Sequence, residues 1–223
     1  MSFNLVRLDW PWRSTDRGQA RQILDRADFD GSLPPAGDTA GDVDASTYER
    51  NEFSEINGQC LDLDGFHDGT VRGNRCTNKK SAAEYPHGSF AIVMNNTHPN
   101  AHSGNIEISG NTVDGSKFGG LFLMGSGNKI TGNQFLRLNL AGCNESNGKF
   151  PCIYKSDEPQ MLESGIYLDA GASRPEPVRG NIIRDNEISG YKMKTRCIAL
   201  APGVSRAGNT IENNSCSDGP AIH

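Results

Sequence analysis

The feature that most constrains this chain is a short motif that recurs from about residue 48 onward. In each copy an apolar residue stands three positions before an Asn, and another apolar residue or a Cys follows two positions after it. The Asn itself usually follows a Gly, Asp or Asn. The clearest copy is 180–188, and the others lie at 69–76, 105–113, 127–135 and 208–216, with a weaker one at 48–53.

This motif predicts a strand, a tight turn and a second strand. A turn this short needs a residue that tolerates the left-handed backbone region, which Gly adopts freely and which Asn and Asp adopt more cheaply than other side chains. The Asn amide can also hydrogen-bond outward. We therefore expect the copies to stack, with an Asn column that holds them in register.

The spacing of these Asn residues predicts a solenoid. Successive Asn positions differ by 23, 37, 22, 53 and 28, so the shortest unit is about 22 residues and the longer gaps are insertions. A third short apolar strand precedes each pair. These segments are 61–63, 90–94, 121–123, 166–168 and 198–200.

The repeat resembles that of the right-handed parallel β-helix proteins, the superfold of pectate lyases, polygalacturonases, alginate epimerases and phage tailspikes. The resemblance covers roughly residues 48–223. It implies an all-β fold, a single-stranded right-handed parallel β-helix of about five or six coils. An antiparallel sandwich or barrel is the rival fold, but it does not explain why the same Asn recurs with such different loop lengths between copies.

The two ends of the chain depart from the repeat. We expect residues 1–45 to form an N-terminal capping helix and loop, and residues 46–223 to form the β-helix domain. Apolar residues at helical spacing in 19–29, after a helix start at 14–16, predict one short amphipathic helix that covers the open end. Residues 219–223 read like the start of another coil, so the chain either continues or is covered there by a partner or a second copy.

Length and charge narrow the classes of partner. At 223 residues the chain suits one sizeable domain. A formal net charge of -5 gives no basic footprint, so no nucleic-acid partner is predicted. No stretch approaches the ~20 apolar residues of a membrane span. The first residues lack a signal-peptide pattern, so the protein is either intracellular or preceded by a leader.

The six cysteines occupy matching places in the repeat. Cys60 and Cys197 precede apolar alternating strands, whereas Cys76 and Cys216 each fall two residues after a motif Asn. This correspondence suggests the disulfides Cys60 with Cys76, Cys143 with Cys152, and Cys197 with Cys216. The alternative is that these thiols are small apolar core residues. Six free thiols would move the expected compartment to the cytosol and the expected role to a cytosolic scaffold.

The outer face of the first strand in each coil is the predicted functional surface. If the apolar residues of these strands point into the core, alternation places their neighbours outside. In the family that this chain resembles, that face binds polysaccharide, and insertions at 77–87, 95–104, 139–164 and 170–179 would form its walls. The candidate catalytic residues on this face are Asp62, Asp64, Tyr167 and Asp169.

Distances decide which of these carboxylates can cooperate. Coils lie about 4.8 Å apart, so Asp64 and Asp169, three coils apart, are expected about 14 Å from each other, too far for a glycosidase pair. Asp62 and Asp64 lie two residues apart on one strand and are expected about 6.6 Å apart, within the range of an inverting hydrolase. The plainer alternative is that an Asp beside a turn caps that turn.

A lyase or epimerase has other needs. It requires a base near C5 of a uronate and a cation or amide that neutralises the sugar carboxylate. The adjacent aspartates with Gly-His-Gly of polygalacturonases and the Asp-Pro-His-Glu signature of alginate epimerases are absent. The reaction class therefore stays open. Candidate substrate-binding residues around the face are His67, Phe122, Lys155 and Arg174.

No cofactor is predicted, and Ca²⁺ is the one ion left open. His98 and His102 lie four residues apart, but in a Pro-containing loop rather than on a helix, so we do not expect a metal site there. Lys192, Lys194 and Arg196 form a basic alternating strip before the last complete coil. This strip is either a solvated strand face or a contact to an anionic sugar.

The sequence therefore predicts a carbohydrate-active β-helix protein that acts on or binds an extracellular polysaccharide, as a lyase, epimerase or glycoside hydrolase. The alternative is a non-catalytic β-helix that serves as a binding or assembly module of a spike or surface protein. Both interpretations imply an extracellular or cell-surface location. The polysaccharide is implied by the resemblance, and a homo-oligomer is left open by the unfinished C-terminal coil.

Overall fold

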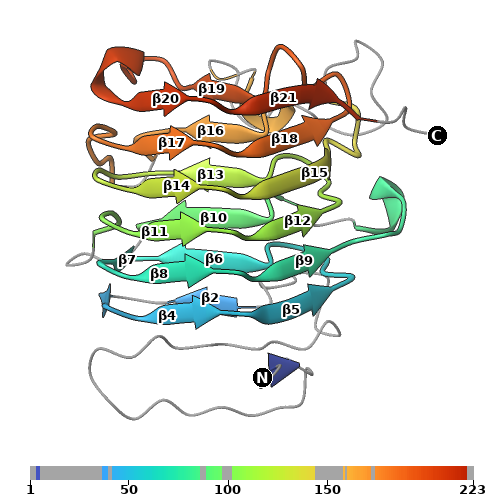
Figure 1. Cartoon of the computed structure of the whole chain (residues 1–223), viewed down its shortest axis with the longest axis horizontal. Helices are drawn as coiled ribbons and strands as arrows, with labels where there is room; N and C mark the ends of the chain where they lie inside the picture. Colours follow the sequence, from blue (N-terminus) through green and yellow to red (C-terminus); the bar gives the residue numbers. More distant parts are fainter. Residues whose placement is uncertain are drawn as a thin grey trace.

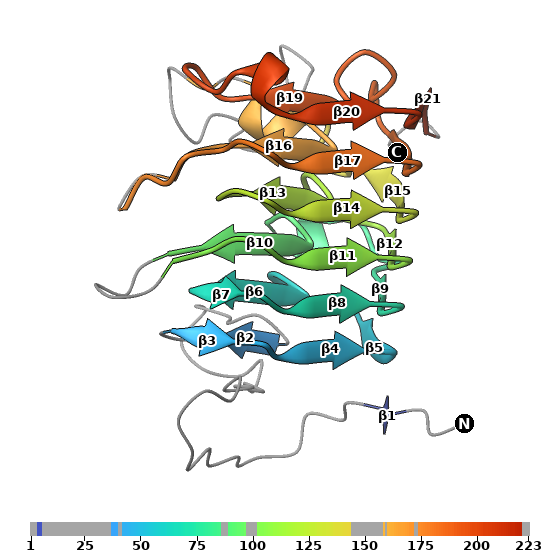
Figure 2. The same ribbon diagram turned by 60° about the vertical axis from the view of Figure 1, so that its left-hand side comes forward.

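The computed structural model describes residues 4–5, 37–39, 42–85, 89–96, 102–143, 158, 160–171 and 174–219. Throughout these residues the chain winds through stacked parallel strands (Figure 1 and Figure 2). The predicted all-β parallel β-helix of about five or six coils is confirmed, because six successive coils are described. The helices in this part of the chain are single 3-10 turns, none long enough to cross a membrane. They are η1 (Ala82–Glu84), η2 (Met161–Glu163) and η3 (Arg206–Gly208).

Each coil contributes one strand to each of three parallel sheets. Sheet 1 contains β2 (Gly37–Thr39), β6 (Leu61–Asp64), β10 (Ile92–Asn95), β13 (Leu121–Leu123), β16 (Ile166–Leu168) and β19 (Ile198–Leu200). Sheet 2 contains β4 (Thr47–Glu49), β8 (Thr70–Arg72), β11 (Glu107–Ser109), β14 (Lys129–Thr131), β17 (Ile182–Arg184) and β20 (Thr210–Glu212). Sheet 3 contains β1 (Asn4–Leu5), β5 (Asn51–Ser54), β9 (Arg75–Thr77), β12 (Thr112–Asp114), β15 (Gln134–Leu138), β18 (Glu187–Gly190) and β21 (Ser215–Asp218).

A short extra ladder lies between sheets 1 and 2 in the N-terminal coils. β3 (Val43–Asp44) pairs with β7 (Phe66–His67), which places Asp44 beside His67. Isolated bridges continue this ladder from His67 to Gly104 and from Gly104 to Ser126. Four successive coils are therefore held in register at this corner, and the side chains of coils 1 to 3 are brought together there.

The tight turn between sheets 2 and 3 has the predicted backbone. The residue immediately before each motif Asn has a positive φ, for example 63° at Gly73 and 57° at Asp185. Arg50 takes this position in the first coil with a φ of 54°, although it is neither Gly, Asp nor Asn. The turn geometry is therefore common to all six coils, whereas the residue that adopts it varies.

The motif Asn residues form a buried column, as predicted. Asn133 shows the pattern, because its Nδ2 donates to Asn186 Oδ1 at 2.9 Å and to the Ile108 carbonyl oxygen at 2.9 Å. Its Oδ1 accepts from both the backbone N–H and Nδ2 of Asn111, each at 2.9 Å. The column joins adjacent coils and runs through Asn51, Asn74, Asn111, Asn133, Asn186 and Asn214.

A second Asn column, which the sequence analysis did not predict, lies at the turn between sheets 1 and 2. Asn128 accepts from the Ile106 backbone N–H at 3.1 Å, and Asn181 accepts from the Asn128 backbone N–H at 2.9 Å. Asn181 Nδ2 donates in turn to Asn209 Oδ1 at 2.9 Å. This column starts only in coil 4, since Ile106 occupies the matching position of coil 3.

The core fills the space inside the three sheets. The predicted inward residues of sheet 1 are buried in coils 2 to 5, with Leu63 and Leu123 fully buried. In the last described coil the inward Ile198 and Leu200 are half-buried, because no further described coil covers them. Continuous burial of this kind drives the stacking of coils that cannot bury their apolar faces alone.

The described ladder begins earlier than expected. β2 and β3 fall within the stretch up to residue 45 that the sequence analysis expected to be a loop. Their strand pairing comes from β6 and β7 of the next coil, and such tertiary pairing overrides weak local strand preference. The predicted helix over 19–29 lies outside the described residues, so the capping role of that segment stays a prediction.

Two of the three predicted disulfides are present. Cys60–Cys76 and Cys197–Cys216 join Cα atoms 6.3 Å and 5.9 Å apart. Each one links the start of a sheet 1 strand to the sheet 3 strand of the same coil. The third predicted pair, Cys143 with Cys152, includes a residue outside the described ranges and stays a prediction.

Candidate functional site

The predicted face follows one row of outward positions along sheet 1. Strand register aligns Asp62 with Val93, Val93 with Phe122, and Phe122 with Tyr167. Asp62 and Asp64 are half-buried and alternate with the buried leucines of β6, as predicted. Asp64 pairs in register with Asn95 of the next coil. Both carboxylates therefore belong to the N-terminal end of this face.

A second apolar cluster covers the C-terminal end of the same face. Phe122 packs between two aromatic rings, with ring centroids 5.9 Å from Phe90 and 6.2 Å from Tyr167. The cluster draws residues from sheet 1 and from the described ends of the insertion between β15 and β16. Its buried members are Phe90, Ala141, Cys143, Met161, Leu162, Tyr167, Ala199 and Ala201. This half of the face is thus an interior surface.

The four candidate catalytic residues therefore fall into two groups, one buried and one on the open part of the face. Tyr167 is only 1% exposed, and its hydroxyl donates to Glu158 Oε2 at 3.0 Å. Asp169 is buried and accepts from the Gly171 backbone N–H at 3.1 Å, which is the turn-capping arrangement considered as the plainer alternative. Three inter-strand steps separate β6 from β16, as the sequence-based estimate for Asp64 and Asp169 assumed. Asp62 and Asp64 remain as the pair that lies together.

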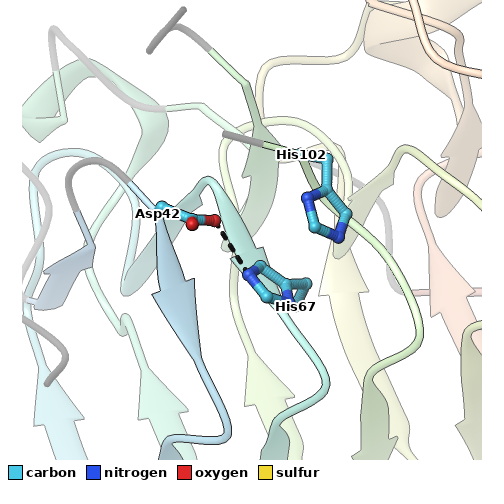
Figure 3. A group of neighbouring side chains, drawn as sticks. All are labelled: Asp42, His67 and His102. Carbon is cyan, nitrogen blue, oxygen red and sulfur yellow. Dashed lines mark hydrogen bonds and ion pairs between the residues drawn. The ribbon is translucent and has the colours of Figure 1, made fainter. Parts of the chain in front are cut away.

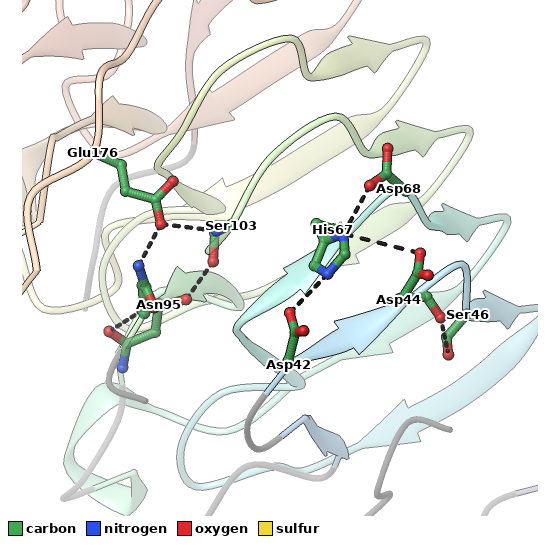
Figure 4. Close-up of polar contacts among 9 residues, drawn as sticks. Asp42, Asp44, Ser46, His67, Asp68, Asn95, Ser103 and Glu176 are labelled. Carbon is green, nitrogen blue, oxygen red and sulfur yellow. Dashed lines mark hydrogen bonds and ion pairs between the residues drawn. The ribbon is translucent and has the colours of Figure 1, made fainter. Parts of the chain in front are cut away.

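A cluster of histidines and carboxylates lies at the corner formed by β3 and β7, where β7 follows β6 along the chain. The His67 ring lies against three aspartates (Figure 4): its Nδ1 is 2.7 Å from Asp68 Oδ2 and 3.9 Å from Asp44 Oδ1, and its Nε2 is 2.9 Å from Asp42 Oδ1. The ring of His102 stacks on that of His67, with centroids 4.0 Å apart and planes inclined by 23°. We call Asp42, Asp44, His67, Asp68 and His102 the corner cluster.

The electrostatics of the corner cluster favour a positive charge at its centre. Burial alone would lower the pKa of His67, but the hydrogen bonds and charges of Asp68 and Asp42 outweigh it and raise that pKa above its usual value. The pKa of Asp68 is lowered by the hydrogen bond from His67 and by a second one from Asn105. The site therefore holds a cation readily and repels anions.

The predicted substrate-binding residues also separate. His67 is central to the corner cluster, beside β6. Phe122 is half-buried in the second apolar cluster, and Arg174 is half-buried in the loop after β16. Lys155 lies outside the described residues.

Two of the predicted wall loops are tied to each other. Glu176, in the loop after β16, accepts from the Ser103 backbone N–H at 2.9 Å (Figure 4). It also accepts from Asn96 Nδ2. Ser103 Oγ in turn donates to the Asn95 carbonyl oxygen. The loops that leave β10 and β16 therefore form one connected edge beside sheet 1.

The basic strip lines a surface hollow near the last described coil. Lys192, Lys194, Thr195, Arg196 and Asp218 surround it. Arg196 forms an ion pair with Glu163, and the Lys194 backbone N–H donates to Asp218 Oδ1 at 3.0 Å. These acidic partners offset much of the positive charge, so the hollow is a weaker anion site than the sequence alone indicates.

Most of the corner cluster is not predicted by the sequence. His67 is predicted as a substrate-binding residue, but Asp42 and Asp44 fall in the stretch expected to be a loop outside the β-helix. His102 is considered only with His98, which lies outside the described residues. The sequence does contain a signal for this cluster. If the residues after the first strand of each coil are aligned, Val43 matches Phe66, and Asp44 then lies beside His67. Residues far apart in sequence meet here because the coils stack.

Comparison with known proteins agrees with this architecture. The family described as right handed beta helix region matches residues 40–223, which is more than half of the chain. The chain belongs to this family of right-handed β-helix proteins. No curated protein and no solved structure matches it.

Proposed function

We propose that this protein is a carbohydrate-active β-helix protein that binds and hydrolyses an extracellular polysaccharide on the outer face of sheet 1, over β6 and the C-terminal end of β10. The observation that carries the proposal is the placement of Asp62 and Asp64 at successive outward positions of one strand, on the part of the face that the second apolar cluster does not cover. The two disulfides are compatible with an extracellular location.

The spacing of this pair suits hydrolysis with inversion. Residues two apart on a strand lie roughly 6.6 Å apart, and inverting glycosidases hold their two carboxyl groups about 6.5 to 9.5 Å apart. One carboxyl group would protonate the glycosidic oxygen as the general acid. The other would take a proton from the water that attacks the opposite side of the sugar ring.

The charges around the pair favour a neutral sugar. The corner cluster adds three aspartates beside β6, so a polyuronate would meet like charge. A lyase or epimerase would also need a cation at the sugar carboxylate, for which Arg174, in the loop after β16, is the described candidate. A neutral β- or α-linked glycan is the substrate class that these residues suit.

A second candidate function is a non-catalytic binding or assembly module. The burial of Tyr167 and Asp169 favours it, because half of the predicted catalytic face is used for packing. In that case the open half of the face would bind a glycan without hydrolysing it. The two candidates differ in whether new reducing ends are formed.

The test is an assay of the full chain against a panel of neutral and uronic-acid polysaccharides, with reducing ends and absorbance near 235 nm followed together. We expect reducing ends from one neutral glycan, with no unsaturated product. Asp62→Asn and Asp64→Asn should each lower the rate at least ~100-fold, because each removes one member of an acid–base pair. Glu212→Gln, an exposed carboxylate on sheet 2, is the matched control and should retain the wild-type rate.

Three results would contradict the hydrolase. Unsaturated products would indicate a lyase, and activity that survives both Asp substitutions would place the chemistry elsewhere. Binding of a glycan with no product from any member of the panel would favour the non-catalytic module.

A further inference from the structure

Three successive coils bring nitrogen and oxygen ligands to one point of the corner cluster. Asp42 comes from coil 1, His67 from coil 2 and His102 from coil 3 (Figure 3). One ligand atom from each of these residues lies within 4.8 Å of the other two. This grouping is separate from the Asp62 and Asp64 pair of the proposed function.

The hydrogen bonds of His67 fix its orientation. Asp68 lies 2.7 Å from Nδ1, and the other carboxylate oxygen of Asp68 accepts from Asn105. An imidazole that donates Nδ1–H to a carboxylate has its lone pair on Nε2, and this is the arrangement in which metal-ligating histidines are usually held. The second carboxylate oxygen of Asp68 is occupied, so Asp68 acts as an orienting partner.

The lone pair on Nε2 then points at Asp42. Nε2 lies 2.9 Å from Asp42 Oδ1, where two lone pairs repel each other unless a cation sits between them. A proton fills that place in a metal-free protein. A divalent metal ion could take the place of that proton.

The position of His102 distinguishes these two cations. A shared proton is held between two atoms and does not require a third ligand. A metal ion in a protein takes three or more ligands. The His102 ring stacks on His67 and offers that third ligand atom within reach of the first two.

We propose that Asp42, His67 and His102 bind a divalent transition-metal ion, for which Zn²⁺ is the best match, with Asp68 orienting the His67 ring. Two imidazole nitrogens and one carboxylate oxygen are ligands that Zn²⁺ prefers, whereas Ca²⁺ takes oxygen ligands.

Metal binding requires the side chains to rearrange, because the His102 ring is stacked on that of His67. Tetrahedral Zn²⁺ holds its nitrogen and oxygen ligands roughly 3.4 Å from each other, given metal–ligand distances of about 2.0 to 2.2 Å. The 2.9 Å between Nε2 and Asp42 Oδ1 therefore has to open slightly. Asp42 has a 57% exposed side chain and His102 is exposed, so both can adjust while buried His67 stays fixed.

Metal binding at this point would join coils 1, 2 and 3. The ion would add a side-chain cross-link at the corner where the β3–β7 pair and isolated bridges join the coils. Zn²⁺ should therefore raise the thermal stability of the protein without any sugar present.

The experiment uses the full chain without a polyhistidine tag, treated with EDTA and dialysed. Titration calorimetry with ZnCl₂ alone should show one equivalent bound, and Zn²⁺ should raise the Tm. His102→Ala and Asp42→Asn should each weaken the affinity at least tenfold. Asp44→Asn is the matched control, since Asp44 lies 3.9 Å from Nδ1 on the side occupied by Asp68, and it should stay within about twofold of wild type.

His102 and Asp42 are the chosen positions because both are exposed, so their variants should fold. Visible absorption of the Co²⁺-loaded protein gives a second readout and should show a tetrahedral spectrum that His102→Ala loses. The proposal is overturned if wild type binds no Zn²⁺, or if His102→Ala binds as tightly as wild type. It is equally overturned if Asp44→Asn abolishes binding while Asp42→Asn does not.

Discussion

The Asn side chains of the main column each replace backbone hydrogen bonds that a turn would otherwise leave unmade. Asn133 is 1% exposed and takes part in four side-chain hydrogen bonds to Asn111, Asn186 and Ile108. Asn214, at the last described coil, is half-buried and donates to the Ile183 and Glu212 carbonyl oxygens. The position of each Asn along the column therefore determines how much its side-chain amide contributes to the stability of the folded protein.

Asn133→Ala should destabilise the protein by about 3 kcal/mol, because it leaves buried donors and acceptors without partners. Asn214→Ala should cost only about 1 kcal/mol, since water can reach the groups that it exposes. Urea unfolding of both variants measures the difference. Equal losses would mean that the column does not work through buried hydrogen bonds.

A second residue-scale prediction concerns Tyr85, which is 2% exposed. Its hydroxyl donates to Glu55 at 2.5 Å, and burial together with this hydrogen bond raises the pKa of Tyr85 to about 12. Because the folded pKa lies above the unfolded value near 10, Tyr85 contributes stability that is complete below about pH 10 and is lost as pH rises through about 12. Absorbance at 295 nm should therefore show a late-ionising tyrosine that Tyr85→Phe lacks. A titration curve unchanged above pH 11 would contradict this.

At the scale of single coils, the two disulfides occupy equivalent places with unequal surroundings. Cys60 and Cys76 are buried, whereas Cys197 and Cys216 are half-buried in the last described coil. The first bridge lies within a well-covered coil. The second one holds a coil whose inner face is only partly covered.

Replacing Cys197 and Cys216 by Ala should therefore loosen the last coil first. A disulfide that closes a loop of this size stabilises the folded state by about 3 kcal/mol. Hydrogen exchange should accelerate in β20 and β21 while the amides of β8 and β9 stay protected. The matched variant with Ala at Cys60 and Cys76 should instead lower the stability of the whole domain. Uniform acceleration in both variants would show that the coils do not unfold separately.

Strand pattern and turn chemistry were predictable because both are local. The left-handed residue before Asn133 and the alternation of Leu61 with Asp62 follow directly from backbone geometry. The burial of Tyr167 was not predictable, because the residues that cover it come from an insertion whose fold the repeat does not determine. Met124 likewise departs from alternation, since it follows the end of β13 and packs into the main core.

At the scale of the whole molecule, the stacking of the coils determines which functional side chains lie near each other. It places Asp62 and Asp64 beside the corner cluster and leaves the C-terminal half of sheet 1 to packing. The corner cluster itself depends on three coils meeting, so it could be found only once β3 was paired with β7. Function is therefore expected on one short part of one face.

The direct test of that claim is a variant in which an added side chain blocks the outer face of sheet 1. Asn95 is half-buried on β10, in register with Asp64 and outside the second apolar cluster, so Asn95→Arg places a long charged side chain where the glycan would lie. Thr131→Arg is the control, because Thr131 is also half-buried and outward-facing but belongs to sheet 2. Circular dichroism and the Tm should first show that both variants are folded.

The measurement is the affinity of each variant for neutral oligosaccharides, by titration calorimetry. We predict that Asn95→Arg binds at least tenfold more weakly than wild type, while Thr131→Arg stays within twofold. A folded Asn95→Arg variant that binds as tightly as wild type would contradict the placement of the site on this face.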